Sequence, residues 1–154
     1  MRWSPEKSVR LSEAVTWVAL VCAIVSIPLL PFLPRILYLP GTLLFDSRYL
    51  TEAFVPLYLC LACGVVALVI LLFLLRDIGR GEVFTQSNVT RLRVISWCGF
   101  AILVVCVAAA ILVSARPTFI LLAAAAGFLG LLMRVIKNVI DAARLLKEDA
   151  DYTI

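Results

Sequence analysis

The stretch FVPLYLCLACGVVALVILLFLL, residues 54–75, contains no charged residue and decides the class of this protein. A transmembrane helix needs about 20 apolar residues, because each residue advances it by about 1.5 Å and the hydrocarbon core is about 30 Å thick. Three other uncharged runs have a similar length, at residues 14–33, 94–115 and 117–133. Hydrophobic residues make up 64% of the chain and charged residues 16%, outside the usual range of soluble domains. The sequence therefore predicts an all-α integral membrane protein that crosses the bilayer four times.

The connections between the four runs are too short for a soluble domain, so residues 1–154 are expected to form one membrane domain. The expected fold is a four-helix bundle made of two antiparallel hairpins. Its helices are expected to cover about residues 12–33, 54–75, 86–115 and 118–148. This assignment makes residues 35–53 an external link, and it places Pro56 in the first turn of the second helix.

Three prolines, Pro28, Pro31 and Pro34, follow the regular part of the first helix. Each lacks a backbone N–H and clashes with the preceding turn, so the outer end of this helix is expected to be kinked or unwound. Backbone carbonyls left unpaired in this way must either be covered by other helices or reach the headgroup region. The sequence leaves both alternatives open.

Lys and Arg are distributed unevenly between the two sides of the membrane. Only Arg35, Arg48 and Arg116 lie in the two links on one side. The residues on the other side are Arg2, Lys7, Arg10, Arg76, Arg80, Arg91, Arg93, Arg134, Lys137, Arg144 and Lys147. The positive-inside rule places both termini in the cytoplasm, where this basic face is expected to contact anionic headgroups of the lipid bilayer. No segment outside the membrane is long enough to fold as a domain that recognises nucleotide bases, so no direct nucleic-acid partner is expected.

The link between the second and third helices has local signals at both ends. Gly79 and Gly81 follow the second run and indicate a turn. Thr85 is expected to cap the third helix, its hydroxyl accepting a hydrogen bond from a first-turn amide. Phe84 and Val89 then have the spacing of a hydrophobic staple. Asn88 lies where a capping box usually has Glu or Gln.

Small residues are concentrated in the hairpin of the third and fourth helices. The third helix has three consecutive alanines at 108–110, and the fourth has Ala123-x-x-x-Gly127 and Ala126-x-x-x-Gly130. Lipid provides no hydrophobic drive for helix association, so close backbone approach between small residues must supply the attraction. The spacing fits packing within the bundle, and it also fits a homo-oligomer interface.

The helical pattern of the fourth run continues beyond the membrane as an amphipathic extension of about four turns. The apolar positions of the extension are Leu132, Val135, Ile136, Val139, Ile140, Ala143 and Leu146. This stripe needs a surface to cover it. The candidates are the bilayer interface, the link between the second and third helices, a second copy of the chain, or a cytoplasmic partner.

The chain offers little of the chemistry that catalysis or metal binding requires. It contains no histidine, the commonest general base and transition-metal ligand. The uncharged runs hold no ionisable carboxylate or amine, at which ion-coupled transporters usually bind their ion. Glu13, at the edge of the first run, is the nearest candidate. The sequence therefore predicts a protein that is not an enzyme and holds no cofactor or metal, with a small transporter or export subunit as an alternative.

Five cysteines fall inside the expected helices, and Cys60 and Cys63 have the C-x-x-C spacing of thiol–disulfide enzymes. A membrane thiol–disulfide oxidoreductase is therefore a third alternative. Four-helix enzymes of that kind relay electrons through a second, external cysteine pair, which the external links here lack. Free cysteine also commonly serves as a small apolar residue in a core.

Two short stretches on the basic side carry a family resemblance. These are Gly81-x-x-Phe84-x-x-x-Asn88-x-x-x-Leu92-Arg93, and Asp151-x-Thr153-Ile154 at the C-terminus, with Tyr152 where leucine is expected. Together they resemble domain-of-unknown-function family 2975, small bacterial membrane proteins with four predicted helices. The resemblance implies location in the bacterial inner (plasma) membrane. Members are often encoded beside small helix-turn-helix regulators, which implies a cytoplasmic partner of that class.

The sequence thus favours a non-enzymatic interaction or signalling protein whose cytoplasmic face binds or restrains a helix-turn-helix regulator. The candidate partner-binding residues are Asp77, Arg80, Phe84, Asn88, Arg91, Arg93, Asp141, Asp151, Thr153 and Ile154. A turn, a staple and a cap would explain Gly81, Phe84 and Asn88 without any partner. The C-terminal tail is expected to be extended, and it needs a receiving surface because ordering it costs conformational entropy.

Overall fold

The computed structural model describes residues 5–32, 47–81, 85–112 and 116–152, and within these ranges it contains helices and no strand. The helices are α1 (Pro5–Leu29), the short 3₁₀ helix η1 (Leu30–Phe32), α3 (Ser47–Gly79), α4 (Gln86–Leu112) and α5 (Arg116–Tyr152). Four of them are long and apolar enough to cross a membrane. The prediction of an all-α protein is confirmed for the described residues, and so is the prediction of four helices that are long and apolar enough to span a membrane.

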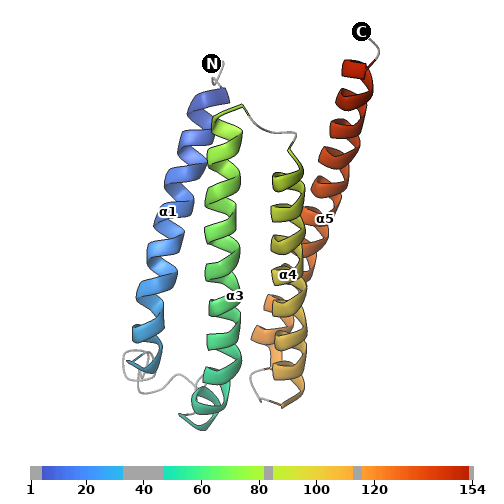
Figure 1. The fold of residues 1–154 in the computed structure, drawn as a ribbon. Coiled ribbons are helices and arrows are strands. Elements are labelled where there is room, and N and C mark those ends of the chain that lie inside the picture. Colours follow the sequence, from blue (N-terminus) through green and yellow to red (C-terminus); the bar gives the residue numbers. More distant parts are fainter. Residues whose placement is uncertain (1–4, 33–46, 82–84, 113–115, 153–154) are drawn as a thin grey trace.

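Helices that follow one another in the sequence also pack against one another in space. α1 packs against α3, α3 against α4, and α4 against α5, which is the most extensive of the three contacts. Neighbouring helices run in opposite directions (Figure 1), so the starts of α1 and α4 lie at the same end of the molecule as the ends of α3 and α5. We call this end the basic end, because it carries the arginines and lysines of residues 76–93 and 134–147.

The outer surface of the helices suits a hydrocarbon environment. Large apolar side chains are exposed along all four long helices; Val55, Ile111 and Leu121, for example, are 68%, 72% and 73% exposed. Contiguous apolar surface of this extent is typical of contact with a membrane. Apolar side chains that are buried, such as Cys106 and Phe119, lie instead where helices touch.

The close contact between α4 and α5 depends on two glycines. A Cβ atom placed on Gly99 would lie 3.0 Å from the Gly130 Cα and 3.2 Å from the Ala126 carbonyl oxygen. The Ser96 hydroxyl donates a hydrogen bond to the Gly130 carbonyl, with an Oγ–O distance of 2.9 Å. Ala123, Ala126 and Gly130 are all buried in the structure. The small residues of α5 therefore pack within the chain. Their partners on α4 include the predicted Ala109, which is buried in one cluster with Ala123, and also Ser96 and Gly99, which the sequence analysis does not name.

The proline-rich end of α1 is held by α3. The α-helix ends at Leu29 and the chain continues as the 3₁₀ turn η1, which confirms the expected unwinding as far as Phe32. Pro31 cannot donate to the Ile27 carbonyl, which instead accepts a hydrogen bond from the Tyr58 hydroxyl at 3.1 Å. Leu30 is buried. Another helix therefore satisfies the Ile27 carbonyl, as the first of the two alternatives predicts; Pro34 lies outside the described residues.

Several predicted boundaries were wrong, because helices continue beyond the apolar runs. α1 begins at Pro5 rather than near residue 12. Proline is tolerated at the first position of a helix, because the backbone N–H that it lacks has no partner within the helix there. α3 begins at Ser47, so Pro56 lies inside the helix and residues 47–53 do not belong to a link. α5 runs to Tyr152, so Asp151 and Tyr152 are helical rather than part of an extended tail. Hydropathy marks the span within lipid, whereas the helix can extend further into the headgroup region and water.

Candidate functional site

The turn between α3 and α4 is built from a glycine and a helix cap. Gly81 follows the end of α3 with a φ of 84°, in the left-handed region that favours glycine, and its amide donates to the Ile78 carbonyl at 3.0 Å. At the start of α4, the Thr85 Oγ1 accepts a long hydrogen bond of 3.4 Å from the Asn88 amide. The predicted cap is therefore confirmed. The predicted staple partner Phe84 lies outside the described residues.

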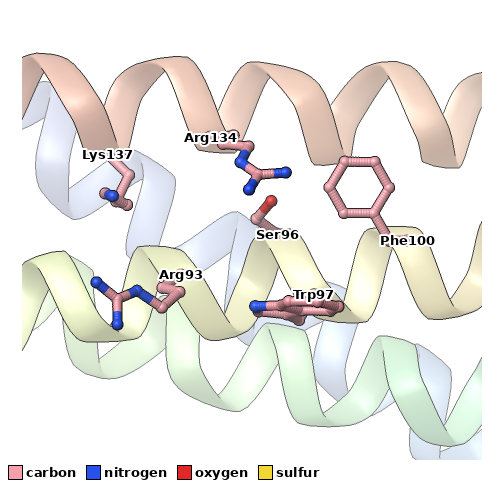
Figure 2. A pocket seen from close by; sticks show the side chains of 6 residues that line it. All are labelled: Arg93, Ser96, Trp97, Phe100, Arg134 and Lys137. Carbon is pink, nitrogen blue, oxygen red and sulfur yellow. The ribbon is translucent and has the colours of Figure 1, made fainter.

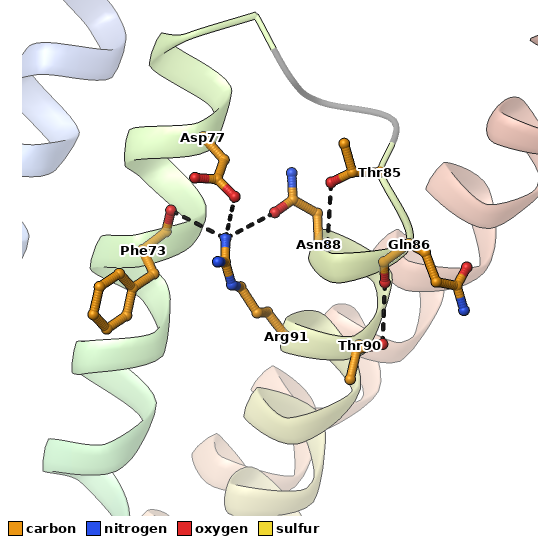
Figure 3. Close-up of polar contacts among 7 residues, drawn as sticks. All are labelled: Phe73, Asp77, Thr85, Gln86, Asn88, Thr90 and Arg91. Carbon is orange, nitrogen blue, oxygen red and sulfur yellow. Dashed lines mark hydrogen bonds and ion pairs between the residues drawn. The ribbon is translucent and has the colours of Figure 1, made fainter.

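Arg91 joins α3 to α4 at the basic end (Figure 3). Its Nη1 atom lies within hydrogen-bond reach of three acceptors: the Asp77 carboxylate, the Asn88 Oδ1 at 3.1 Å and the Phe73 carbonyl oxygen at 3.4 Å. Its guanidinium also lies 5.8 Å from the centroid of the Phe73 ring. Asn88 is fully buried. We call Asp77, Asn88 and Arg91 the clamp, because their side chains link the last turns of α3 to the first turns of α4.

The carboxylate of the clamp lies at a helix end that disfavours it. Asp77 lies in the last turn of α3, where the helix dipole is negative, whereas Arg91 lies in the second turn of α4, where the dipole effect has fallen off. Pairing with Arg91 offsets the unfavourable placement of Asp77. The side chains of Asp77 and Arg91 are 20% and 29% exposed, so solvent screens the pair only in part. Three candidate partner-binding residues are thus already bonded to one another, in a contact that holds two helices together.

The remaining candidate residues are dispersed. Arg80 is exposed beyond the last turn of α3, and Asp141 is half-buried on α5. Asp151 lies in the last turn of α5, and Thr153 and Ile154 lie outside the described residues. The remaining candidate, Arg93, belongs to a pocket that the sequence reading did not find.

The pocket lies between α4 and α5 on the side of the Gly99–Gly130 contact nearer the basic end, and has a volume of about 410 Å³. Figure 2 shows its lining: Arg93, Ser96, Trp97 and Phe100 from α4, and Arg134 and Lys137 from α5. The Arg134 guanidinium lies 5.9 Å from the centroid of the Phe100 ring. The sequence does contain a signal for a basic site here, because Arg93 and Arg134 are the charged residues directly next to two of the uncharged runs. Their closeness, however, depends on how α4 and α5 cross.

The extension of α5 is tied to the start of α4 through Arg144. The Arg144 Nη1 donates a hydrogen bond to the Gln86 side-chain oxygen. Its Nε is buried, and lies 3.7 Å from the Glu148 Oε1, outside hydrogen-bond distance. The predicted apolar stripe is largely uncovered: Val139 is 62% exposed and Leu146 is 71% exposed. One face of the extension therefore contacts α4, while an apolar face is left open.

The residues considered for transport and redox chemistry have other contacts. Glu13 forms an ion pair with Arg76, with an Oε1–Nε distance of 3.3 Å, and Arg76 lies 5.9 Å from the centroid of the Trp17 ring. The Cys60 Sγ lies 3.6 Å from the Sγ of Cys106 on α4. Among the described residues, no group of three His, Cys, Asp or Glu side chains could hold a metal ion.

Comparison with known proteins gives one match. Residues 17–154 match the family described as "Protein of unknown function (DUF2975)". No curated protein and no solved structure gives a significant match to the chain. The matched segment contains the clamp, the pocket and the whole of α5.

Proposed function

The chain belongs to the family of proteins of unknown function DUF2975, and from its structure we propose that it binds a soluble cytoplasmic regulator at its basic end, without catalysis. The membrane is then the bacterial inner (plasma) membrane, with both termini in the cytoplasm. This orientation is supported by the excess of Lys and Arg around the helix ends that meet at the basic end. The regulator is a small helix-turn-helix protein, the class that the family resemblance implies.

The exposed apolar stripe on the α5 extension is the observation that carries this proposal. About 18 Å of helix separates Leu146 from Arg134, the first charge after the apolar run, at about 1.5 Å per residue. The headgroup region adds only about 5–8 Å on each side of the hydrocarbon core. Leu146, which is 71% exposed, therefore extends beyond the depth at which lipid could cover it.

A bend of the extension down onto the membrane would also cover the stripe, but the contacts of Arg144 oppose it. The hydrogen bond from Arg144 to Gln86 keeps the extension beside the first turn of α4. Val135, Val139 and Leu146 lie at i, i+4 and i+11, a spacing that places them along one side of a helix. Such a face fits a helix-in-groove contact with a soluble partner.

The test is capture of the tagged full-length protein from its own host in mild detergent, with mass spectrometry of the proteins retained. Leu146→Gln is compared with Lys147→Gln, which introduces the same side chain one position along on a different face. Burying a leucine is worth about 1.5–3 kcal/mol, so Leu146→Gln should reduce recovery of a helix-turn-helix protein about tenfold or more. Lys147→Gln should change it by less than about twofold. Equal recovery with both variants, or no such protein with the unsubstituted chain, would refute the proposal.

A further inference from the structure

We propose that the pocket between α4 and α5 binds the phosphate group of an anionic phospholipid from the leaflet at the basic end. The proposal does not depend on the regulator, because it concerns a different surface of the molecule. It rests on the charge of the pocket, on its depth relative to the apolar runs, and on its mixed polar and aromatic lining.

The pocket concentrates positive charge that has no counter-ion in the described structure. Arg93, Arg134 and Lys137 line it, and none of the described residues in its lining is acidic. Within the described part of the chain, none of these three cations forms an ion pair. Asp141 lies four residues after Lys137 on α5, and no ion pair joins these two described side chains. Three like charges around one cavity repel one another, so an anion between them is electrostatically favourable.

The pocket lies at the depth where lipid phosphates are found. Arg93 directly precedes the uncharged run 94–115, and Arg134 directly follows the run 117–133. Both helices therefore cross the boundary between hydrocarbon and headgroups at the pocket. Basic pockets between transmembrane helices on the cytoplasmic side are a recurring way to bind anionic headgroups.

The aromatic residues of the pocket extend it toward the hydrocarbon. Trp97 lies one turn deeper than Arg93 along α4 and is 67% exposed, and Phe100 lies nearly one turn deeper again. Figure 2 shows the Trp97 ring lying along α4, and the side chains of Arg134 and Lys137 extending from α5 toward α4. Tryptophan and phenylalanine offer apolar surface to an acyl chain, which a soluble phosphate does not have. This arrangement of cations above an aromatic wall favours a lipid as the source of the phosphate.

The close contact of α4 and α5 forms the base of the site. Gly99 and Gly130 bring the two helices together, and the bond from the Ser96 hydroxyl to the Gly130 carbonyl fixes their spacing at this level. Because the Ser96 proton is used in that bond, we assign binding of the phosphate to the three cations and not to the hydroxyl. Arg134 is also steadied by the ring of Phe100 beneath its guanidinium.

The experiment measures lipid binding to the purified full-length protein by native mass spectrometry in detergent. Phosphatidylglycerol and phosphatidylcholine are added separately, and inorganic phosphate in large excess is added as a competitor. The test variant is Arg134→Gln with Lys137→Gln. The matched control is Arg80→Gln, which removes an exposed cation of the basic end outside the pocket.

One saturable phosphatidylglycerol site with much weaker phosphatidylcholine binding is expected. A cation near a membrane surface contributes about 1 kcal/mol to binding of anionic lipid, so each loss should weaken phosphatidylglycerol binding about fivefold and the double variant about 25-fold. Arg80→Gln should change it by less than about twofold. Arg134→Lys with Lys137→Arg, which keeps both charges, should retain selectivity, and circular dichroism checks that each variant is folded.

Three results would overturn the proposal. Equal binding of the two lipids would show that the pocket does not distinguish an anionic headgroup from a zwitterionic one, in which the choline cation balances the phosphate charge. An equal loss with Arg80→Gln would show a general effect of surface charge rather than a pocket. Complete displacement of the lipid by inorganic phosphate, with the same dependence on Arg134 and Lys137, would assign the pocket to a soluble phosphate compound instead.

Discussion

Gly99→Ala tests whether the contact between α4 and α5 is as close as the structure indicates. The added methyl carbon would meet the Gly130 Cα at 3.0 Å and the Ala126 carbonyl oxygen at 3.2 Å, whereas carbon atoms pack best at about 3.5–4.0 Å. Both neighbours are backbone atoms that cannot rotate away. The two helices must therefore separate by roughly 0.5–1 Å, which also stretches the 2.9 Å bond from Ser96 to Gly130.

The size of the effect follows from overpacking and from the weakened hydrogen bond. Overpacking a close contact costs about 1–3 kcal/mol, and an interhelical hydrogen bond in a membrane protein averages about 0.6 kcal/mol. Alanine gains up to about 1 kcal/mol over glycine from helix propensity. Gly64→Ala is the matched control, because a Cβ on Gly64 of α3 would have nothing within 4 Å. The propensity gain is common to both variants, so Gly99→Ala should be less stable than Gly64→Ala by about 1.5–3.5 kcal/mol.

The assay is reversible unfolding in mixed micelles, followed by circular dichroism, for both variants and the unsubstituted protein. Gly127→Ala provides an intermediate case, because its added methyl group would meet the flexible Leu103 side chain at 3.1 Å rather than backbone. The expected order of stability is therefore Gly64→Ala, then Gly127→Ala, then Gly99→Ala. Equal stability of Gly99→Ala and Gly64→Ala would refute the close contact, and with it the base of the proposed lipid site.

Two further predictions concern contacts between α3 and α4. The first is a double-mutant cycle of Asp77→Ala and Arg91→Ala in the same unfolding assay. Its coupling energy should be about 1 kcal/mol, because the pair is charged, hydrogen-bonded and only partly exposed. A coupling energy near zero would contradict the clamp. Mild oxidation should cross-link Cys60 to Cys106, whose sulfurs are 3.6 Å apart and need to approach to about 2.05 Å. The cross-link is detected by peptide mass spectrometry, and it should persist in Cys63→Ser and vanish in Cys106→Ser. Loss of the cross-link in Cys63→Ser would mean that Cys63, and not Cys60, pairs with Cys106.

The fold was predictable to the extent that it depends on local sequence. The uncharged runs identify four helices because backbone groups in hydrocarbon must be paired within the helix. The Thr85 cap was also predictable, since its acceptor and donor lie within four residues. Helix ends were misplaced where polar residues continue a helix outside lipid, as at Ser47 and Tyr152. Composition carries no signal for such ends unless a cap or a proline marks them.

The candidate sites were only partly predictable, because they depend on how the helices cross. Asp77 and Arg91 were both identified as candidates, but their pairing requires α3 and α4 to place them side by side. The pocket needs the backbone approach of Gly99 and Gly130, residues 31 positions apart on different helices. The sequence predicts Arg134 only as one of the basic residues that follow the apolar part of the fourth helix. Its place beside Phe100 is a property of the folded protein.

The clamp changes which part of the basic end is suited to a partner. Asp77 and Arg91 are bonded to each other, and a regulator that used them would first have to break a contact between helices. Arg144 is likewise used on the face of α5 that contacts α4. The stripe that includes Leu146 is exposed already, so a partner could cover it without disturbing the helix packing. Substitution of the clamp should therefore lower stability, whereas substitution of Leu146 should lower partner capture at unchanged stability.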